Sequence, residues 1–145
     1  MDKYIFIKDF IFSEDYDFCH NLAKKNMEKL VIKHWGSWNS DIYKKSFDGE
    51  NTKIFIFNNK RIGFFRIKSK ESIFYIEDLQ IIPSMKRKGF GTKIINIIES
   101  DAKNRGEKKI QLTVFKDNSA FKFYQKLNYK IIEEQAKTYL MEKIL

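Results

Sequence analysis

The spacing of apolar residues along the chain separates helical from extended segments. Over residues 13–34 the apolar side chains recur every three or four positions, which is the period of one helix face. Ser13, Glu14 and Asp15 have the small polar and acidic character of a helix start, and Gly36 marks the end. The predicted buried face consists of Cys19, Leu22, Ala23, Met27, Leu30 and Val31. Cys19 is therefore expected to be a buried apolar residue and not a nucleophile.

Three shorter helices follow from the same period. The first begins at Asn39 or Ser40, either of which can cap it, and runs to Phe47. The second covers about residues 91–105, with Gly106 as its C-terminal stop. The third covers residues 119–127. The second of these helices is predicted to bury Ile94, Ile95, Ile98 and Ala102.

The remaining apolar segments have the composition of strands. They cover residues 4–12, 52–57, 61–68, 72–82, 109–115, 129–133 and 138–144. Hairpin-length loops join the second, third and fourth of them, which indicates an antiparallel meander. The order β-α-α-β-β-β-α-β-α-β-β predicts a single α/β (α+β) domain over residues 1–145. Its mixed, mostly antiparallel sheet has about seven strands and is flanked by about four helices.

Composition narrows the classes of function. The net charge is +9 and the pI about 9.5, but basic residues are spread among acidic ones, which disfavours nucleic-acid binding. The two His and the one Cys all lie in the first 34 residues without the spacing of zinc ligands, so no metal is expected. No apolar run approaches the roughly 18 residues of a membrane span, and the N-terminus lacks a signal-peptide pattern. We expect a cytoplasmic protein without a membrane partner.

A glycine turn carries the most specific chemistry. It reads Lys86-Arg87-Lys88-Gly89-Phe90-Gly91-Thr92 and stands directly before a predicted helix. Backbone N–H groups at a helix N-terminus bind phosphate oxygens, and the basic residues add positive charge. The nucleoside-triphosphate loop is absent, and Ile94 replaces the third glycine of a dinucleotide fingerprint. The turn therefore predicts a pyrophosphate site of another kind.

Two motifs flank this turn in a recognisable order. The first is Leu79-Gln80-Ile81-Ile82-Pro83 followed by the glycine turn, and the second is Asn118 followed by Ala120-Phe121-Lys122-Phe123-Tyr124 and then Asn128-Tyr129. Together they resemble the GNAT superfamily of acyl-CoA-dependent N-acyltransferases. The resemblance extends over the whole chain and is most specific between Ile76 and Tyr129. It departs from the family pattern at Lys86, where Arg or Gln is usual, and at Asn128, where Gly is usual.

The resemblance implies how acetyl-CoA would be held. The pyrophosphate would bind the backbone of the glycine turn, from Lys86, Arg87 and Lys88 through Gly89, Phe90, Gly91 and Thr92. Pantetheine would lie along the segment Leu79-Gln80-Ile81 like an added strand, which requires the fourth and fifth strands to splay apart. A backbone N–H near Leu79 would polarise the thioester carbonyl. Asn118 would contact the pantetheine arm, although the spacing from Ala120 leaves Asp117 as the alternative.

The resemblance also implies catalytic roles. Tyr124 matches the tyrosine that protonates the leaving thiolate in many family members, and its alternative role is that of a core aromatic residue. Glu77, two residues before Leu79, is the candidate base for the amine, or else a structural or rim carboxylate. Asp78 points to the other face of the strand. Trp35, Trp38 and Tyr43 border the region where the family binds its acceptor, or else they only pack in the core.

These observations predict an N-acetyltransferase that moves an acetyl group from acetyl-CoA to a primary amine by direct attack in a ternary complex. The alternatives are transfer of another short acyl group and a non-catalytic module that senses CoA or associates with nucleic acid. The acceptor is a small molecule or a peptide amine, and small amines, aminoglycosides, polyamines, protein N-termini and lysines all stay open. A homodimer is an alternative to a monomer.

Overall fold

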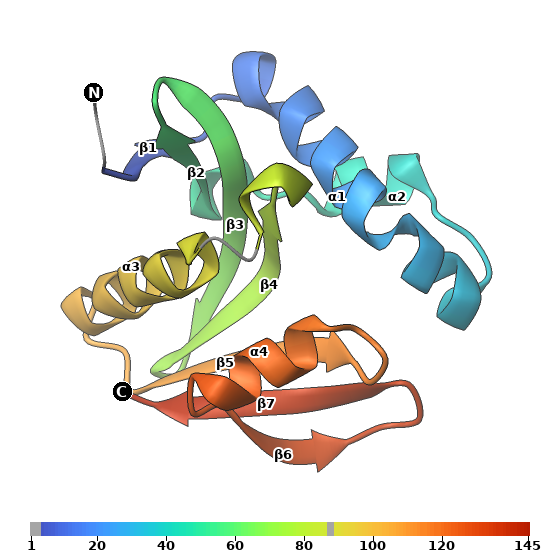
Figure 1. The fold of residues 1–145 in the computed structure, drawn as a ribbon, viewed down its shortest axis with the longest axis vertical. Coiled ribbons are helices and arrows are strands. Elements are labelled where there is room, and N and C mark those ends of the chain that lie inside the picture. Colours follow the sequence, from blue (N-terminus) through green and yellow to red (C-terminus); the bar gives the residue numbers. More distant parts are fainter. Residues whose placement is uncertain (1–3, 87–88) are drawn as a thin grey trace. The chain divides into compact units, whose positions relative to one another are not determined.

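The computed structural model describes residues 4–86 and 89–145. Seven strands form one sheet in the order β1-β2-β3-β4-β5-β7-β6, and the β4–β5 pair is parallel (Figure 1). This confirms the predicted mixed sheet with four helices. The strands are β1 (Phe6–Asp9), β2 (Thr52–Phe57), β3 (Lys60–Lys70), β4 (Ile73–Ile81), β5 (Lys109–Phe115), β6 (Lys130–Glu134) and β7 (Thr138–Ile144). The helices are α1 (Phe12–Trp35), α2 (Ser40–Ser46), α3 (Phe90–Asn104) and α4 (Ala120–Lys126).

The chain divides into two compact units. The first unit contains the described residues up to Arg66 together with residues 78–86, and the second contains residues 67–77 and 89–145. Strands β3 and β4 each contribute one part to either unit. The prediction of one domain over residues 1–145 stays a prediction.

Helix α1 forms the core of the first unit with β2 and β3. Cys19, Leu22 and Ala23 of the helix are buried in one cluster with Ile54 and Phe64. Burial raises the pKa of the Cys19 thiol well above its usual range, which confirms the buried, unreactive cysteine expected from the helical spacing. The other predicted members of this face, Met27, Leu30 and Val31, are half-buried.

Helix α3 supplies the core of the second unit. Its predicted stripe of Ile94, Ile95, Ile98 and Ala102 is buried, as the helical period required. Strands β5 and β7 pair along the whole length from Lys109↔Ile144 to Phe115↔Thr138, and α4 lies beside β5 (Figure 1). The largest fully buried side chains of this unit are Tyr129, Phe74, Ile110 and Met141 together with Ile94, Ile95 and Ile98 of α3.

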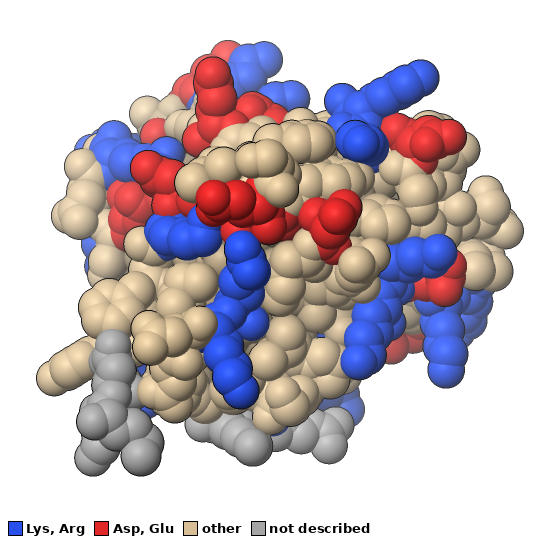
Figure 2. Space-filling model, turned by 90° about the horizontal axis from the view of Figure 1, so that it is seen from above, with Lys and Arg blue, Asp and Glu red and all other residues tan. Residues whose placement is uncertain are grey.

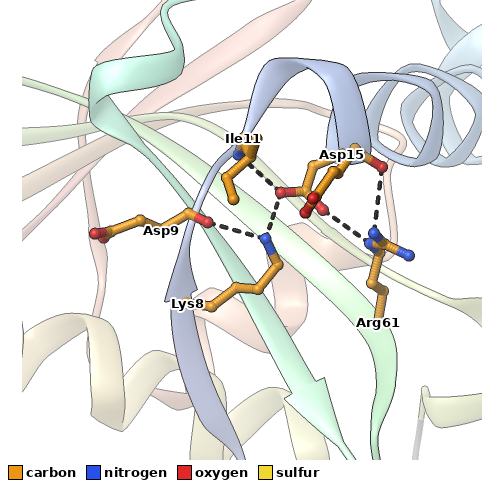
Figure 3. A network of polar contacts seen from close by, with 6 residues as sticks. Lys8, Asp9, Ile11, Asp15 and Arg61 are labelled. Atoms are coloured by element: carbon orange, nitrogen blue, oxygen red, sulfur yellow. Dashed lines mark hydrogen bonds and ion pairs between the residues drawn. The ribbon is translucent and has the colours of Figure 1, made fainter.

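The start of α1 differs from the prediction. The strand expected over residues 4–12 is confined to Phe6–Asp9, and the helix begins at Phe12, so Ser13 lies inside the first turn. The reason is the Asp15 carboxylate, which turns back and accepts the Ile11 N–H at 2.8 Å (Figure 3). Lys8 and Arg61 pair with the same carboxylate, which has no exposed side-chain surface. A side chain within the helix therefore fixes its start.

Charges are mixed over the surface that Figure 2 presents. Lys and Arg side chains lie there beside Asp and Glu side chains and do not gather into one basic area. Within the described residues, no helix is long and apolar enough to cross a membrane.

Candidate active site

The N-terminus of α3 is built around two glycines. Gly89 precedes the helix with φ +80°, in the left-handed region, and a Cβ atom there would meet nothing within 4 Å. Its requirement for glycine is therefore conformational. Gly91 is required for a different reason, because a Cβ atom there would lie 3.0 Å from Cζ of Phe123. A side chain at Gly91 would displace the aromatic ring contributed by α4.

The N-cap residue of this helix is Gly89, which has no side chain to cap it. The first turn of the helix contains no acidic residue, and the first helical bond runs from Lys93 N–H to the Gly89 carbonyl at 3.3 Å. The N-terminus of an α-helix carries the positive end of its dipole, which attracts negative charge. Lys86 is exposed just before the turn, whereas Arg87 and Lys88 lie outside the described residues. The arrangement suits an anion.

The C-terminal part of β4 lies close against β3. Ile82 N–H donates to the Ile62 carbonyl at 2.8 Å. A Cβ atom at Gly63 would come within 2.4 Å of the Gln80 carbonyl oxygen. Gly63 therefore has to be glycine for the two backbones to approach this closely. The close approach fixes the course of β4 through the predicted donor segment Leu79-Gln80-Ile81.

The β4–β5 ladder covers only part of the two strands. In the described structure it pairs Ile73–Ile76 of β4 with Lys109–Leu112 of β5. Both strands continue past the last pair, β4 to Ile81 and β5 to Phe115. The splay between the fourth and fifth strands stays a prediction.

A polar network fills the interior of the first unit beside β4. The Asp78 carboxylate accepts the Tyr43 hydroxyl at 2.8 Å, Arg66 Nε at 3.3 Å and Gln80 Nε2 at 2.7 Å. Asn26 Nδ2 donates to Gln80 Oε1 and to the Ile81 carbonyl, both at 3.1 Å. The Asp78 and Arg66 side chains are 9% and 10% exposed, so this is a buried and well-satisfied ion pair. Burial and the neighbouring Asp78 raise the pKa of Tyr43 far above its usual range.

The two carboxylates of β4 have different surroundings. Asp78 is engaged in the buried network, whereas Glu77 is exposed, as alternation along a strand predicts. Glu77 is therefore accessible to solvent, and Asp78 is held by its three partners. Of the two, only Glu77 has the access that a base needs, although its catalytic role stays a prediction.

The second motif forms the loop and helix after β5. Asn118 is half-buried, and its Oδ1 accepts the Ala120 N–H at 3.0 Å, whereas Asp117 is exposed. Asn118 thereby opens α4, which carries Tyr124. The Tyr124 ring is 8% exposed and packs edge-on against Tyr129, with the ring centroids 5.6 Å apart. This position is compatible with a core aromatic residue and with a proton donor to the leaving thiolate.

Tyr129 is itself held by a buried polar cluster. Its hydroxyl donates to Glu99 Oε2 at 3.0 Å, and Lys143 Nζ donates to the two Glu99 oxygens at 3.0 and 3.1 Å. Burial, with Glu99 as the next cause, raises the pKa of Tyr129 well above its usual range. The ring that packs against Tyr124 is therefore fixed by α3 and β7.

The predicted acceptor residues are not equivalent. Trp38 and Tyr43 lie in one aromatic group with His20, and their ring centroids are 5.5 Å apart. The Arg66 guanidinium lies 5.0 Å from the Tyr43 ring centroid, so a cation of the chain itself already occupies one position over that ring. Trp35, at the end of α1, is 64% exposed. The structure brings Trp38 and Tyr43 together and leaves Trp35 with a large exposed surface.

Two members of the buried network, Asn26 and Arg66, are absent from the sequence-based site. Asn26 stands three and four residues after Ala23 and Leu22, on the buried face of α1. Arg66 interrupts the apolar run of β3. A polar residue on an apolar face is the signal that could have identified both, because burial requires a partner for it.

Comparison with known proteins gives the family. Residues 22–139 match the family model described as the acetyltransferase (GNAT) domain. The structure is similar to the PaiA N-acetyltransferase from Thermoplasma acidophilum in complex with coenzyme A, with 18% identity, 98% and 99% of the two chains covered and a TM-score of 0.81.

Two other solved structures show the same fold. The ribosomal-protein-S18-alanine N-acetyltransferase from Escherichia coli has 14% identity, with 97% and 94% of the chains covered and a TM-score of 0.74. Naa50 from Arabidopsis thaliana, in complex with the bisubstrate analogue CoA-Ac-MVNAL, has 22% identity, with 96% and 97% covered and a TM-score of 0.62. The family match confirms the acyltransferase class predicted from the two motifs. The chain belongs to the GNAT family of acetyltransferases.

Proposed function

We propose that residues 1–145 act as a single GNAT domain that transfers an acetyl group from acetyl-CoA to a primary amine. The observation that carries this proposal is the start of α3, where a left-handed Gly89 and a first turn without acidic residues follow the glycine turn of a chain that matches the family. In proteins such helix starts bind phosphate groups. The match to a structure named as a CoA complex supports CoA as the phosphate ligand.

Binding of the donor would use backbone groups from both motifs. The pyrophosphate is assigned to the turn of Lys86, Arg87, Lys88, Gly89, Phe90, Gly91 and Thr92. The pantetheine arm is assigned to the segment Leu79-Gln80-Ile81 and to Asn118. Gln80 contributes as the residue between Leu79 and Ile81, because its side chain is used within the buried network and its carbonyl lies against Gly63.

The reaction follows direct attack without a covalent enzyme intermediate. Glu77 accepts a proton from the acceptor ammonium, directly or through water, and the neutral amine attacks the thioester carbonyl carbon. A β4 backbone N–H near Leu79 stabilises the oxyanion that forms. The nitrogen releases its extra proton to solvent, the C–S bond breaks as the amide carbonyl forms, and the CoA thiolate takes the proton of the Tyr124 hydroxyl. Tyr124 then regains a proton from solvent and Glu77 releases the one that it accepted, so that one proton is released in each turnover.

The acceptor is proposed to be a small-molecule or peptide primary amine next to Trp35, Trp38 and Tyr43. Two structural neighbours support a peptide, because one is named as an alanine N-acetyltransferase of a ribosomal protein and the other contains a CoA–peptide bisubstrate analogue. A homodimer and a cytoplasmic location belong to the same proposal.

Replacement of Tyr124 by Phe tests the mechanism. We expect Tyr124→Phe to lower kcat about 100-fold, which is within the range for loss of a general acid, with an unchanged affinity for CoA. The measurement is thiol release from acetyl-CoA that depends on added amine, across a panel of small amines and peptides, together with calorimetric CoA titration.

Tyr139→Phe in β7 is the matched control, because it removes one hydroxyl from a half-buried tyrosine of the same unit and should leave kcat unchanged. An unchanged rate in Tyr124→Phe would remove Tyr124 from the mechanism. A lower kcat in Glu77→Gln with unchanged affinity for CoA would support Glu77 as the base. CoA binding by the wild-type chain without thiol release for any amine would favour the non-catalytic alternative.

A further inference from the structure

We propose that Asn26 of α1 is a positioning residue for the acyl donor. Its amide fixes the Ile81 carbonyl, at the edge of β4 where the pantetheine arm is proposed to bind. This inference rests on the proposed function, because it assigns Asn26 a part in binding CoA. It adds a residue outside both family-like motifs.

Both hydrogens of the Asn26 amide are used. Nδ2 donates to the Ile81 carbonyl and to Gln80 Oε1, each at 3.1 Å. Asn26 lies on the same helix face as Leu22 and Ala23, which are buried against β2 and β3. The core packing of α1 therefore sets the position of this amide.

The Ile81 carbonyl lies on the edge of β4 that faces away from β3. Ile82 N–H donates to the Ile62 carbonyl, and the Gln80 carbonyl lies against Gly63, so residues 80 and 82 direct their backbone groups toward β3. Backbone groups alternate in direction along a strand, which places those of Leu79 and Ile81 on the opposite edge. An extended ligand that adds to β4 as a strand uses the groups of this edge.

The buried network keeps the amide oriented when no ligand is bound. Gln80, which accepts from Asn26, donates in turn to Asp78 at 2.7 Å, and Asp78 is held by Tyr43 and Arg66. A carbonyl oxygen has two lone pairs, so Ile81 can accept a second hydrogen bond, from a pantetheine amide. A carbonyl fixed before binding lowers the ordering cost of association.

Replacement of the Asn26 amide is expected to weaken the binding of CoA but not of its nucleotide half. Asn26→Asp keeps the size of the side chain but places a carboxylate oxygen against the Ile81 carbonyl and Gln80 Oε1. We expect the affinity for CoA to fall about tenfold, the effect of losing one well-placed hydrogen bond and leaving a polar group without its partner. The affinity for 3′-phospho-ADP, the nucleotide half of CoA without pantetheine, should not change.

The experiment is a calorimetric titration of CoA and of 3′-phospho-ADP into the full chain and its variants. Asn26→Ala, which adds no charge, is the second variant and should lower the affinity for CoA about threefold. Asn21→Asp is the matched control, since Asn21 is exposed on the same helix, and it should bind both ligands like the wild type.

The outcomes separate this inference from the proposed function. Wild-type binding of CoA with unchanged affinity in both Asn26 variants would overturn the inference and leave the proposed function standing. An equal loss of affinity for CoA and for its nucleotide half would also overturn it, because it would show a general change of structure. Absence of CoA binding by the wild-type chain would overturn both.

Discussion

Helices α1 and α3 begin in opposite ways. At α1 the Asp15 carboxylate occupies the helix start, where it accepts the Ile11 N–H and pairs with Lys8 and Arg61 (Figure 3). At α3 the first turn contains no acidic residue, and Gly89, which has no capping side chain, leads into the helix in a left-handed conformation. One helix start is occupied by the chain's own anion, and the other is suited to an anion from solution.

The difference shows how the same physical property serves stability in one place and function in another. The positive end of a helix is stabilised by negative charge, whatever its source. In α1 a fully buried carboxylate provides that charge permanently and joins helix, strand and loop. In α3 the two glycines keep side chains away from the turn. The proposed pyrophosphate of CoA would provide the missing charge there.

The largest expected effect comes from removing the internal anion of α1. Asp15→Asn leaves Lys8 and Arg61 without their carboxylate. Because these two side chains are 32% and 39% exposed and can be solvated, we expect the free energy of unfolding to fall by about 2 kcal/mol. Chemical denaturation measures this change. Asp17→Asn, which alters an exposed carboxylate in the same turn, should stay close to the wild type. Equal stability of the two variants would show that Asp15 does not hold the start of α1.

A smaller effect on stability, with a specific effect on binding, is expected at α3. Gly89→Ala forces a Cβ atom into the left-handed region and should cost about 1 kcal/mol. Gly106→Ala is a closely matched control, because Gly106 has φ +79° and, like Gly89, no atom within 4 Å of a Cβ position. Calorimetry should show weaker CoA binding in Gly89→Ala alone. Equal CoA affinity in the two variants would contradict a phosphate site at this turn.

The smallest expected effect is a change with pH. Burial on its own would raise the pKa of Asp15, but the hydrogen bonds from Lys8, Ile11 and Arg61 together lower it below 3.8. Because the folded-state pKa is lowered, the stabilisation is fully present above about pH 3.8 and is lost as the pH falls through the folded-state value. Denaturation at about pH 5 and about pH 3 should therefore show a smaller acid loss in Asp15→Asn than in the wild type. An equal loss of stability in the two proteins would exclude Asp15 as the source of this pH dependence.

The sequence predicts most of the fold because most of its elements satisfy local rules. The spacing of Ile94, Ile95 and Ile98 identifies the buried face of α3, and the alternation after Ile73 separates exposed Glu77 from buried Asp78. The short β1 and the early start of α1 could not be predicted in this way. They depend on Arg61, which is 46 residues away from Asp15 in the chain.

The site was predictable where glycine or a motif marks it. Gly89 is required by its backbone angle and Gly91 by the nearby Phe123 ring. Both requirements are visible in the sequence as conspicuous glycines. The polar network of Asn26, Arg66 and Asp78 has a weaker signal in the sequence, because its members are far apart in the chain. Only the folding of α1 and β3 onto β4 brings these side chains together.

A calorimetric titration of the wild-type chain with acetyl-CoA examines whether the α3 turn is the donor site. We expect saturable binding of one acetyl-CoA per chain, weakened by Gly89→Ala and unchanged by Gly106→Ala. Absence of saturable binding, or equal binding by all three proteins, would contradict the assignment of the α3 turn as the donor site.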